Sequence, residues 1–322
     1  MGSSFLSAAL ASALLLSGAV SAQEAWPNRP IRLVIPFDPG AGSDAIHRYF
    51  GGELSKAVGQ PVVVENISGA GGSIGATRVA RSPADGYTLL GTLVTAVAAL
   101  PHLQRLPYDP VKDFTHVARL GYPVTLIGVN NETGISTLQE LIARARKEPG
   151  KLAFGSAGIG SAPQFRLEAL MSATGIAMTH VPYKGGSAYV SDLLAGRIQV
   201  FADGTLGISL GKAGKVKLLA VLDEKRVKEF PELPAIHELV PNYKIPPTWF
   251  LVQAPAGLPP AIRTRIATEL AKISQRKETA EFLDTAAIRP SSDSPDFNLA
   301  AEVQAAYDMY GEMIKRLNIK AP

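Results

Sequence analysis

Short apolar runs alternate along the chain with longer amphipathic segments, and this order predicts strands and helices in turn. The segment Ile31–Ile35 is mostly β-branched and apolar, which is typical of a buried strand. Further strands are expected at 61–66, 86–92, 114–118, 124–129, 152–154, 177–182, 198–202 and 218–222. Helices are expected at 45–54, 77–80, 187–195, 260–274, 277–284 and 295–318, with one more that Ser136 caps. Such alternation predicts the α/β fold class with largely parallel sheets.

Two loops rich in small residues each stand between a predicted strand and a predicted helix. The first covers residues 36–44 and the second covers residues 155–162. Small residues leave backbone N–H groups accessible, and a helix start leaves further N–H groups without internal partners. Such places bind carboxylate or phosphate without a basic side chain. Two of them, far apart in the sequence, predict a small anionic ligand that is held from two sides.

The N-terminus has the pattern of an export signal. Residues 5–20 are apolar or small and carry no charge, and Val20, Ser21 and Ala22 are small residues before an expected cleavage site. The apolar run is short, which disfavours a permanent transmembrane helix. Residues 1–4 lack the basic residues that usually begin a signal peptide. The uncharged apolar run and the small residues after it nevertheless predict that residues 1–22 are a signal peptide that is cleaved near Ala22.

Composition limits the possible partners. The formal net charge is only +4, and the 32 Lys and Arg residues are spread along the chain, so nucleic acid is not expected as a partner. The chain has no Cys, which excludes disulfides and thiolate metal sites. Its five His residues show no paired metal-ligand spacing. Neither a metal nor a cofactor is expected.

An NAD-dependent oxidoreductase is one alternative. Gly40, Gly42 and Ala45 fit G-x-G-x-x-A, and Glu65 ends the next predicted strand about twenty residues on, where a ribose-binding acid is expected. However, residues 36–39 separate these glycines from the strand, although the fingerprint requires them to follow it directly. The second loop and the export signal also have no role in such an enzyme.

An exported serine hydrolase is another alternative, because residues 207–211 fit G-x-S-x-G around Ser209. That motif needs a sharp turn from a strand into a helix. Here a stretch rich in Gly and Lys leads instead into another predicted strand. The motif therefore lacks the context that its chemistry requires.

Taken together, the ordered motifs of the chain resemble those of the Bug family, the periplasmic solute-binding receptors of tripartite tricarboxylate transporters. Each motif alone is weak, but the set covers the chain beyond the signal in order. The matching segments are 26–37 (WPNRPIRLVIPF), 69–76 (GAGGSIGA), 84–90 (ADGYTLL), 106–114 (LPYDPVKDF), 154–158 (FGSAG), 180–186 (HVPYKGG), 192–196 (DLLAG) and 254–259 (APAGLP).

The resemblance implies a two-domain clamshell with two chain crossovers and a ligand cleft between the domains. One domain would comprise residues 23–123 and 248–322, and the other residues 124–247. The protein would be a monomeric receptor in the periplasm, without catalysis, that delivers a small carboxylate to membrane transporter subunits. Residues carried over as ligand-binding are Phe37, Gly42, Ser43, Asp44, Ser156, Gly158, Gly160, Ser161 and Asp203.

Structural roles compete with these assignments. Loops rich in Gly are often only turns that need positive φ. Asp44 could interact only with the N-terminus of its own helix, an effect of under about 1 kcal/mol. Asp203 could be a turn or cap residue at the end of its strand.

Overall fold

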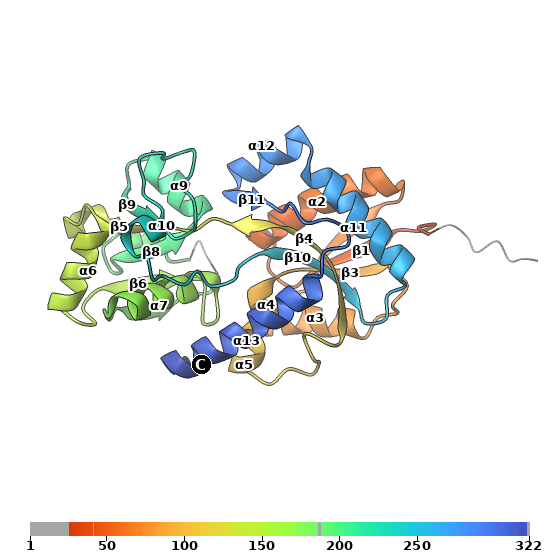
Figure 1. Ribbon diagram of the computed structural model, residues 1–322, viewed down its shortest axis with the longest axis horizontal. Coiled ribbons are helices and arrows are strands. Elements are labelled where there is room, and N and C mark those ends of the chain that lie inside the picture. Colours follow the sequence, from red (N-terminus) through yellow and green to blue (C-terminus); the bar gives the residue numbers. More distant parts are fainter. Residues whose placement is uncertain (1–25, 41, 186–187, 321–322) are drawn as a thin grey trace, which may run out of the picture.

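Two β-sheets form the centres of two lobes (Figure 1). The computed structural model describes residues 26–320 except residues 41, 186 and 187, so the predicted signal peptide lies outside the described residues. The first sheet has the order β11-β4-β10-β3-β1-β2 and the second has the order β7-β6-β8-β5-β9. In the first sheet the strands are β1 (Ile31–Ile35), β2 (Val62–Asn66), β3 (Thr88–Leu93), β4 (Phe114–Pro123), β10 (Phe250–Pro255) and β11 (Ile288–Pro290). The second sheet consists of β5 (Leu126–Asn130), β6 (Ala153–Ser156), β7 (Thr179–Pro182), β8 (Val200–Asp203) and β9 (Val216–Val221).

Helices surround both sheets. Those of the first lobe are α2 (Gly42–Val58), α3 (Ser73–Ala80), α4 (Val94–Ala98), α5 (Leu100–Leu103), α11 (Pro260–Ser274), α12 (Lys277–Thr285) and α13 (Leu299–Leu317). Those of the second lobe are α6 (Leu138–Lys147), α7 (Ala162–Thr174), α8 (Val190–Leu194), α9 (Thr205–Lys212) and α10 (Ile236–Leu239). Two short 3-10 turns lie at Ala70–Gly72 and Asn131–Thr133. The cap of α6 is Thr137 and not Ser136, because the Thr137 side chain accepts the N–H of Glu140 at 3.2 Å.

The expectation of largely parallel sheets is wrong, because both sheets are mixed. β1 runs parallel to β2 and β3, but β10 runs antiparallel to β3 and to β4. In the second sheet β6 is parallel to β7 and β8, whereas β5 is antiparallel to β8 and β9. The reason lies in the crossovers. The chain leaves the first sheet at the end of β4 and returns at the start of β10. The end of β4 and the start of β10 lie side by side, at the end of the sheet that faces the second lobe, so these two neighbouring strands run antiparallel.

This topology turns one end of each sheet, where its strands begin or end, toward the other sheet. We call these two ends the facing edges. β1, β2 and β3 end at the edge where β10 begins, since Phe250 pairs with Leu93. β8 and β9 end at the edge where β5 begins, since Leu126 pairs with Asp203 and with Val221. The chain passes between these edges after β4 and again before β10. The change of sheet after Pro123 and before Phe250 suits the predicted domain boundaries, which stay a prediction.

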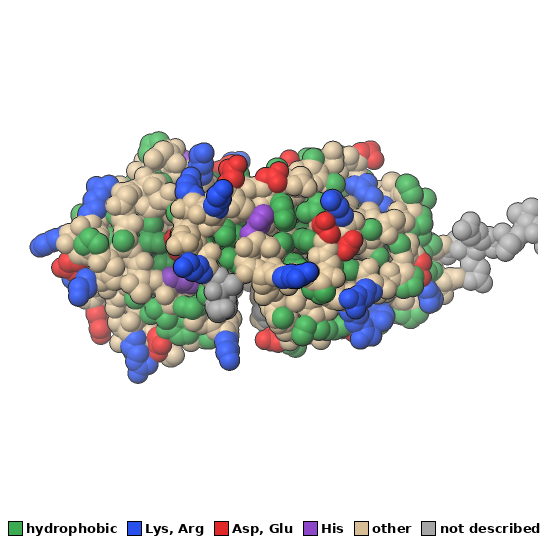
Figure 2. All heavy atoms as spheres, turned by 90° about the horizontal axis from the view of Figure 1, so that it is seen from below, with side chains coloured by type: hydrophobic (Ala, Val, Ile, Leu, Met, Phe, Trp, Pro, Cys, Tyr) green, Lys and Arg blue, Asp and Glu red, His purple; other side chains and the backbone are tan. Residues whose placement is uncertain are grey.

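Apolar packing joins the lobes as well as filling each of them. One buried cluster contains residues of α4 and α13 together with residues of β5, β6 and α7. Within it the rings of Phe165 on α7 and Tyr310 on α13 lie 4.6 Å apart between centroids. Figure 1 shows α13 running from the first lobe toward α7, and Figure 2 shows the two lobes in contact at a waist.

Candidate functional site

The two loops predicted from the sequence lie on the facing edges of the sheets. The first follows β1 and leads into α2, and the second follows β6 and leads into α7. The N–H groups in the first turn of each helix have no acceptor within the helix. Both helices therefore begin close to the facing edges, where β1 and β6 end, each with the partial positive charge of a helix N-terminus.

In the first loop, Asp44 is a structural anchor. Its carboxylate accepts Nε of Arg48 at 2.9 Å, Nδ2 of Asn66 at 2.8 Å and the N–H of Gly40 at 2.9 Å. Burial opposes its ionisation, but these hydrogen bonds outweigh that effect and lower the pKa of Asp44. Asn66 also donates to the carbonyl of Phe37 at 3.0 Å. The carboxylate thus fixes the loop and leaves the N–H groups of the helix start for another anion.

Ser43, next to Gly42 at the start of α2, is tied to a buried histidine. The Ser43 hydroxyl lies 3.3 Å from Nδ1 of His47, and the Ser43 carbonyl lies 2.6 Å from the same atom. Nε2 of His47 lies 3.2 Å from the carbonyl of Leu251 on β10. Burial lowers the pKa of His47 to about 4, so the imidazole is neutral at neutral pH. The first loop is thereby connected to the strand by which the chain returns from the second lobe.

Hydrogen bonds within the second loop occupy most of its polar side chains. The Ser156 hydroxyl lies 2.6 Å from Nε2 of His180 and accepts the N–H of Gly158 at 3.1 Å. The Ser161 hydroxyl donates to the carbonyl of Gly158 at 2.6 Å. Burial lowers the pKa of His180 to about 4, so a neutral ring supports Ser156. The two serines shape the loop.

The N–H of Gly160 donates to Oε1 of Gln164 at 2.8 Å. By contrast, the N–H groups of Ala157 and Ile159 donate to none of the residues that the structure describes. These two groups, with the first turn of α7, are available to a ligand. The structure therefore brings the predicted residues of each loop together, while their role toward a ligand stays a prediction.

Asp203 ends β8 on the same edge of the second sheet. One of its carboxylate oxygens accepts the N–H of Leu206 at 2.9 Å, which caps the start of α9. Desolvation raises the pKa of Asp203 to about 6. The cap role considered for this residue is present, and a side-chain hydrogen bond with the buried Tyr189 partly offsets the desolvation of the carboxylate.

The lobes also touch at the rim of this space. The carbonyl of Ala286 accepts the Thr205 hydroxyl at 2.9 Å, and Lys228 pairs with Asp284 at 2.7 Å. Figure 2 shows Lys and Arg side chains spread over both lobes on the face that it presents. The contacts bring helix α12 and the turn before β11 against the second lobe.

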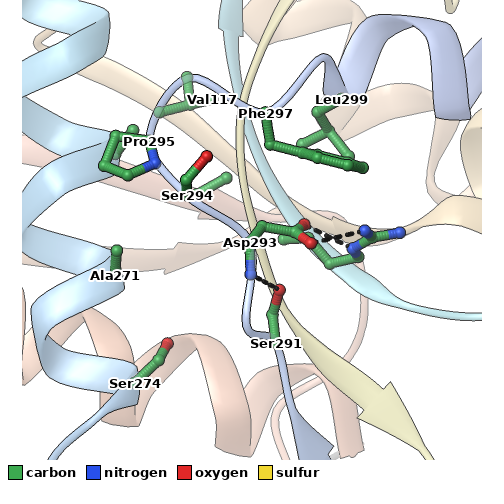
Figure 3. A pocket seen from close by; sticks show the side chains of 12 residues that line it. Val117, Ala271, Ser274, Ser291, Asp293, Ser294, Pro295, Phe297 and Leu299 are labelled. Carbon is green, nitrogen blue, oxygen red and sulfur yellow. Dashed lines mark hydrogen bonds and ion pairs between the residues drawn. The ribbon is translucent and has the colours of Figure 1, made fainter.

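Two cavities lie away from the facing edges. One, of about 20 Å³, lies between β4, α11 and the segment 291–299 (Figure 3). It has room for about one water molecule. The other is a groove of about 390 Å³ beside β9, between α6 and the segment 230–239. Neither includes a residue that the sequence predicted for the ligand.

The structure gives the enzyme motifs other surroundings. Glu65 on β2 accepts two hydrogen bonds from the guanidinium group of Arg32 on the neighbouring strand β1, at 3.0 and 2.6 Å, and so forms an ion pair across the two strands. Ser209 lies inside helix α9 and not at a strand-to-helix turn. Each motif therefore lacks the geometry on which its chemistry depends.

Comparisons with known proteins agree with this architecture. The model of the family described as tripartite tricarboxylate transporter family receptor matches residues 46–319. BugT of Bordetella pertussis is 33% identical over 277 residues, which cover 85% of this chain and 85% of that protein. The chain belongs to this receptor family. Members of this Bug-type receptor family are periplasmic solute receptors, so the resemblance found in the sequence is confirmed.

Two solved structures resemble the receptor over nearly its whole length. R. palustris Rpa4515 with adipate has a TM-score of 0.83 at 32% identity and covers 92% of this chain and 100% of that chain. MatC from Rhodopseudomonas palustris with bound malate has a TM-score of 0.78 at 27% identity and covers 90% and 100%. Within the described part of this receptor, every helix is too short or too polar to span a bilayer.

Several supporting residues of the site were not predicted from the sequence. They are Asn66, His47, Leu103, Gln164 and His180. The role of Gln164 could have been predicted from the sequence, because this residue stands in the first turn of a predicted helix, four residues after Gly160, and its side chain can reach back to the loop. Leu103 on α5 had none, since it acts only by lying against Gly160 of the other lobe, where a β-carbon would come within 2.8 Å of Cδ1 of Leu103.

Proposed function

We propose that this protein is a periplasmic receptor that binds a small carboxylate between the facing edges of its two sheets and delivers it to a membrane transporter. The observation that carries the proposal is that helices α2 and α7 of opposite lobes each begin just after a strand that ends at one of the facing edges. N–H groups there offer hydrogen bonds to a charged acceptor, worth about 1.5–3 kcal/mol each. The adipate and malate bound to two relatives support a carboxylate as the ligand.

Such a receptor works by conformational change and not by turnover. A ligand that contacts both lobes stabilises the arrangement in which the edges lie close together. That arrangement would be the shape that a transporter subunit recognises. We assign no catalytic residue, metal or cofactor, and we expect a monomer whose signal peptide is cleaved before Gln23.

Binding is tested on the purified protein that begins at Gln23. Thermal-shift and titration calorimetry should detect succinate, adipate or another member of a carboxylate panel, with NAD and model esters included for the enzyme alternatives. The corresponding diamides should not bind, because they lack the charge. Failure of every carboxylate to bind, or turnover of an ester that Ser209→Ala abolishes, would contradict the proposal.

A matched pair of variants locates the site. Ala162→Asp puts a carboxylate at the first residue of α7, where it should repel the ligand and weaken binding at least tenfold. Gln139→Asp puts the same group into the first turn of α6, at the far end of the second lobe (Figure 1). Both helices gain the same favourable charge at their N-termini. Only Ala162→Asp should reduce the affinity; equal affinities in both variants would place the site elsewhere.

A further inference from the structure

Several polar contacts between the lobes gather on one short turn of the first lobe. The turn runs from the end of α12 into β11 and covers residues 284–289; we call it the latch turn. Its partners in the second lobe are the start of α9 and the segment 223–228, which follows β9 and which we call the partner segment. Figure 1 shows α12 and β11 on the side of the first lobe that lies nearest to α9.

Each end of the latch turn forms an ion pair with the partner segment. Asp284 accepts a hydrogen bond from Nζ of Lys228 at 2.7 Å, and Nη1 of Arg289 lies 3.3 Å from a carboxylate oxygen of Asp223. Arg289 also donates through Nη2 to the carbonyl of Lys225. The side chains of Arg289 and Asp223 are only 29% and 12% exposed, so solvent screens this pair less than it screens an exposed pair. Charge thus fixes both ends of the partner segment to the first lobe.

The middle of the latch turn meets the second lobe through its backbone. The carbonyl of Ala286 accepts the Thr205 hydroxyl at 2.9 Å. The carbonyl of Ala287 accepts the N–H of Val124 at 2.8 Å, where the chain enters the second lobe. A β-carbon on Gly204 would come within 3.3 Å of the β-carbon of Ala287. The contact therefore extends from the crossover of the chain to the start of α9.

The partners of the latch turn lie beside the proposed ligand site. Gly204 and Thr205 directly follow Asp203, which ends β8 on the facing edge. Asp223 stands two residues after the end of β9, on the same edge. Each of these contacts joins two parts of the chain itself, so none of them depends on a ligand. The latch turn can therefore fix the spacing of the two edges next to the site.

We infer that the latch turn holds the two lobes together before a ligand binds, so that the closed arrangement is already the more populated one. The inference deepens the proposed function and rests on it for its effect on affinity. The apparent affinity for a carboxylate rises with the fraction of the receptor that is already closed. The ligand then stabilises a closed state that exists beforehand, and its release requires the latch turn to leave the partner segment.

A distance between two labels measures the closed fraction. The chain has no Cys, so Ala280→Cys on α12 and Ala213→Cys directly after α9 would carry the only two thiols, both at exposed positions. In the ligand-free receptor, double electron–electron resonance should show one main distance, which succinate or adipate leaves unchanged. Lys228→Glu combined with Arg289→Met should lower the ratio of closed to open receptor at least tenfold, or about 1.4 kcal/mol, and add a longer distance.

Exchange of the exposed ion pair separates the effect of charge from a change in folding. Lys228→Glu alone places two carboxylates against each other and should add the longer distance. Lys228→Glu combined with Asp284→Lys restores opposite charges in reverse order and should restore the wild-type distance. Arg226→Met is the matched control, because Arg226 lies in the partner segment but pairs with Glu238 of its own lobe at 2.6 Å. Its loss should leave the distance unchanged.

The possible results separate the inference from the proposed function. A wild-type distance that shortens markedly on addition of a carboxylate would overturn the inference, because the ligand-free receptor would then be open, and would leave the proposed receptor intact. Unchanged distances in the variant with both pairs broken, or an exchanged pair that does not restore them, would also overturn it. If the wild type binds no carboxylate, the proposed function fails, while the ligand-free distances still decide whether the latch turn holds the lobes together.

Discussion

Gly160 of the second lobe lies directly against Leu103 of the first. A β-carbon at residue 160 would come within 2.8 Å of Cδ1 of Leu103, and Gly160 has a φ of +81°. The loop that leads into α7 is therefore in contact with α5 across the facing edges. At this position the positive φ favours glycine, and a β-carbon would in addition displace the end of the Leu103 side chain.

Gly160→Ala should weaken ligand binding more than it affects folding. A positive φ costs a residue with a β-carbon about 1–2 kcal/mol, so the loop would shift its N–H groups to relieve this strain and the contact with Leu103. We expect a loss of affinity of tenfold or more in calorimetry with the best carboxylate of the panel. The free energy of unfolding should fall by only about 1–2 kcal/mol.

Gly175→Ala is the matched control for this variant. Gly175 follows α7 at the opposite end of the helix and has a φ of +65°, and a β-carbon there would meet no atom within 4 Å. Its alanine variant should lose similar stability and keep its affinity. If both variants bind like the wild type, the loop 156–161 does not hold the ligand.

His47 should make the receptor less stable in mild acid. Its pKa is lowered by burial to about 4, against an ordinary value of 6.5. The unfolded chain therefore binds a proton more readily, and stability is lost as the pH falls through the window from 6.5 to 4. Linkage over this interval gives a loss of about 2 kcal/mol between pH 7.5 and pH 5 from this one side chain.

Urea unfolding of wild type and of His47→Gln at both pH values measures this effect. The glutamine variant should be less stable than the wild type at pH 7.5. Its free energy of unfolding should, however, change less between pH 7.5 and pH 5 than that of the wild type, by about 2 kcal/mol. His116→Gln should reduce the difference likewise, since burial also lowers the pKa of His116 to about 4. An unchanged pH difference in both variants would show that neither imidazole is held neutral.

The repeated strand–loop–helix pattern was enough to predict much of the first lobe and the positions of both loops rich in small residues. β1 spans Ile31–Ile35 as predicted, because a short, mostly β-branched run bounded by Pro30 and Pro36 has few other conformations. The position of each loop at a strand end follows from the same local pattern. Local sequence therefore determined where the helix starts are, and the ordered family motifs supplied the two-lobe arrangement.

Long-range pairing was beyond the reach of local pattern. The strand β10 was not predicted, and β4 extends to Pro123, well past the predicted end at 118. The formation of β10 and the length of β4 both depend on pairing between segments more than a hundred residues apart. The hydrogen bonds of Ser156 and Ser161 were missed for a similar reason. A hydroxyl that could reach a ligand can equally reach its own loop, and only the folded geometry decides between them.

The ion pair of Arg119 and Asp293 should contribute strongly to stability. Arg119 donates two hydrogen bonds to Asp293, at 2.7 and 2.8 Å, beside the small cavity in Figure 3. Its side chain is only 6% exposed and lies near the rings of Tyr122, Trp249 and Phe297. Arg119→Met would leave a poorly solvated carboxylate without a partner, which typically costs about 3–5 kcal/mol.

Chemical unfolding of two variants checks this value. In the exposed pair of Arg29 and Asp85 the side chains are 61% and 39% exposed, so Arg29→Met should cost less than about 1 kcal/mol. Addition of Asp293→Asn to Arg119→Met should recover part of the loss, because the unpaired charge is removed. Equal losses in Arg119→Met and Arg29→Met would mean that Asp293 is well solvated.

Asp203→Asn should stabilise the receptor in the absence of ligand. The pKa of Asp203 is raised by desolvation to about 6, so the folded state binds its proton more tightly than the unfolded chain does. The stability contributed by this side chain is therefore present below about pH 4 and is lost as the pH rises to about 6. At pH 7.5 the variant should be more stable by about 1–2 kcal/mol, after allowance for the solvent that still reaches this partly buried group.

The comparison of two pH values separates this effect from a change in packing. At pH 4 wild-type Asp203 is neutral in the folded state, so wild type and Asp203→Asn should have nearly the same free energy of unfolding. Asp192→Asn should show the opposite sign, because hydrogen bonds from Tyr183 and Arg197 lower the pKa of Asp192 and its charged form is the favoured one. An Asp203→Asn variant that is destabilised equally at both pH values would show that the carboxylate serves only as the cap of α9. A gain in stability at pH 7.5 alone would identify Asp203 as a charge that the receptor retains at a cost to its fold, as expected of a group that meets a ligand.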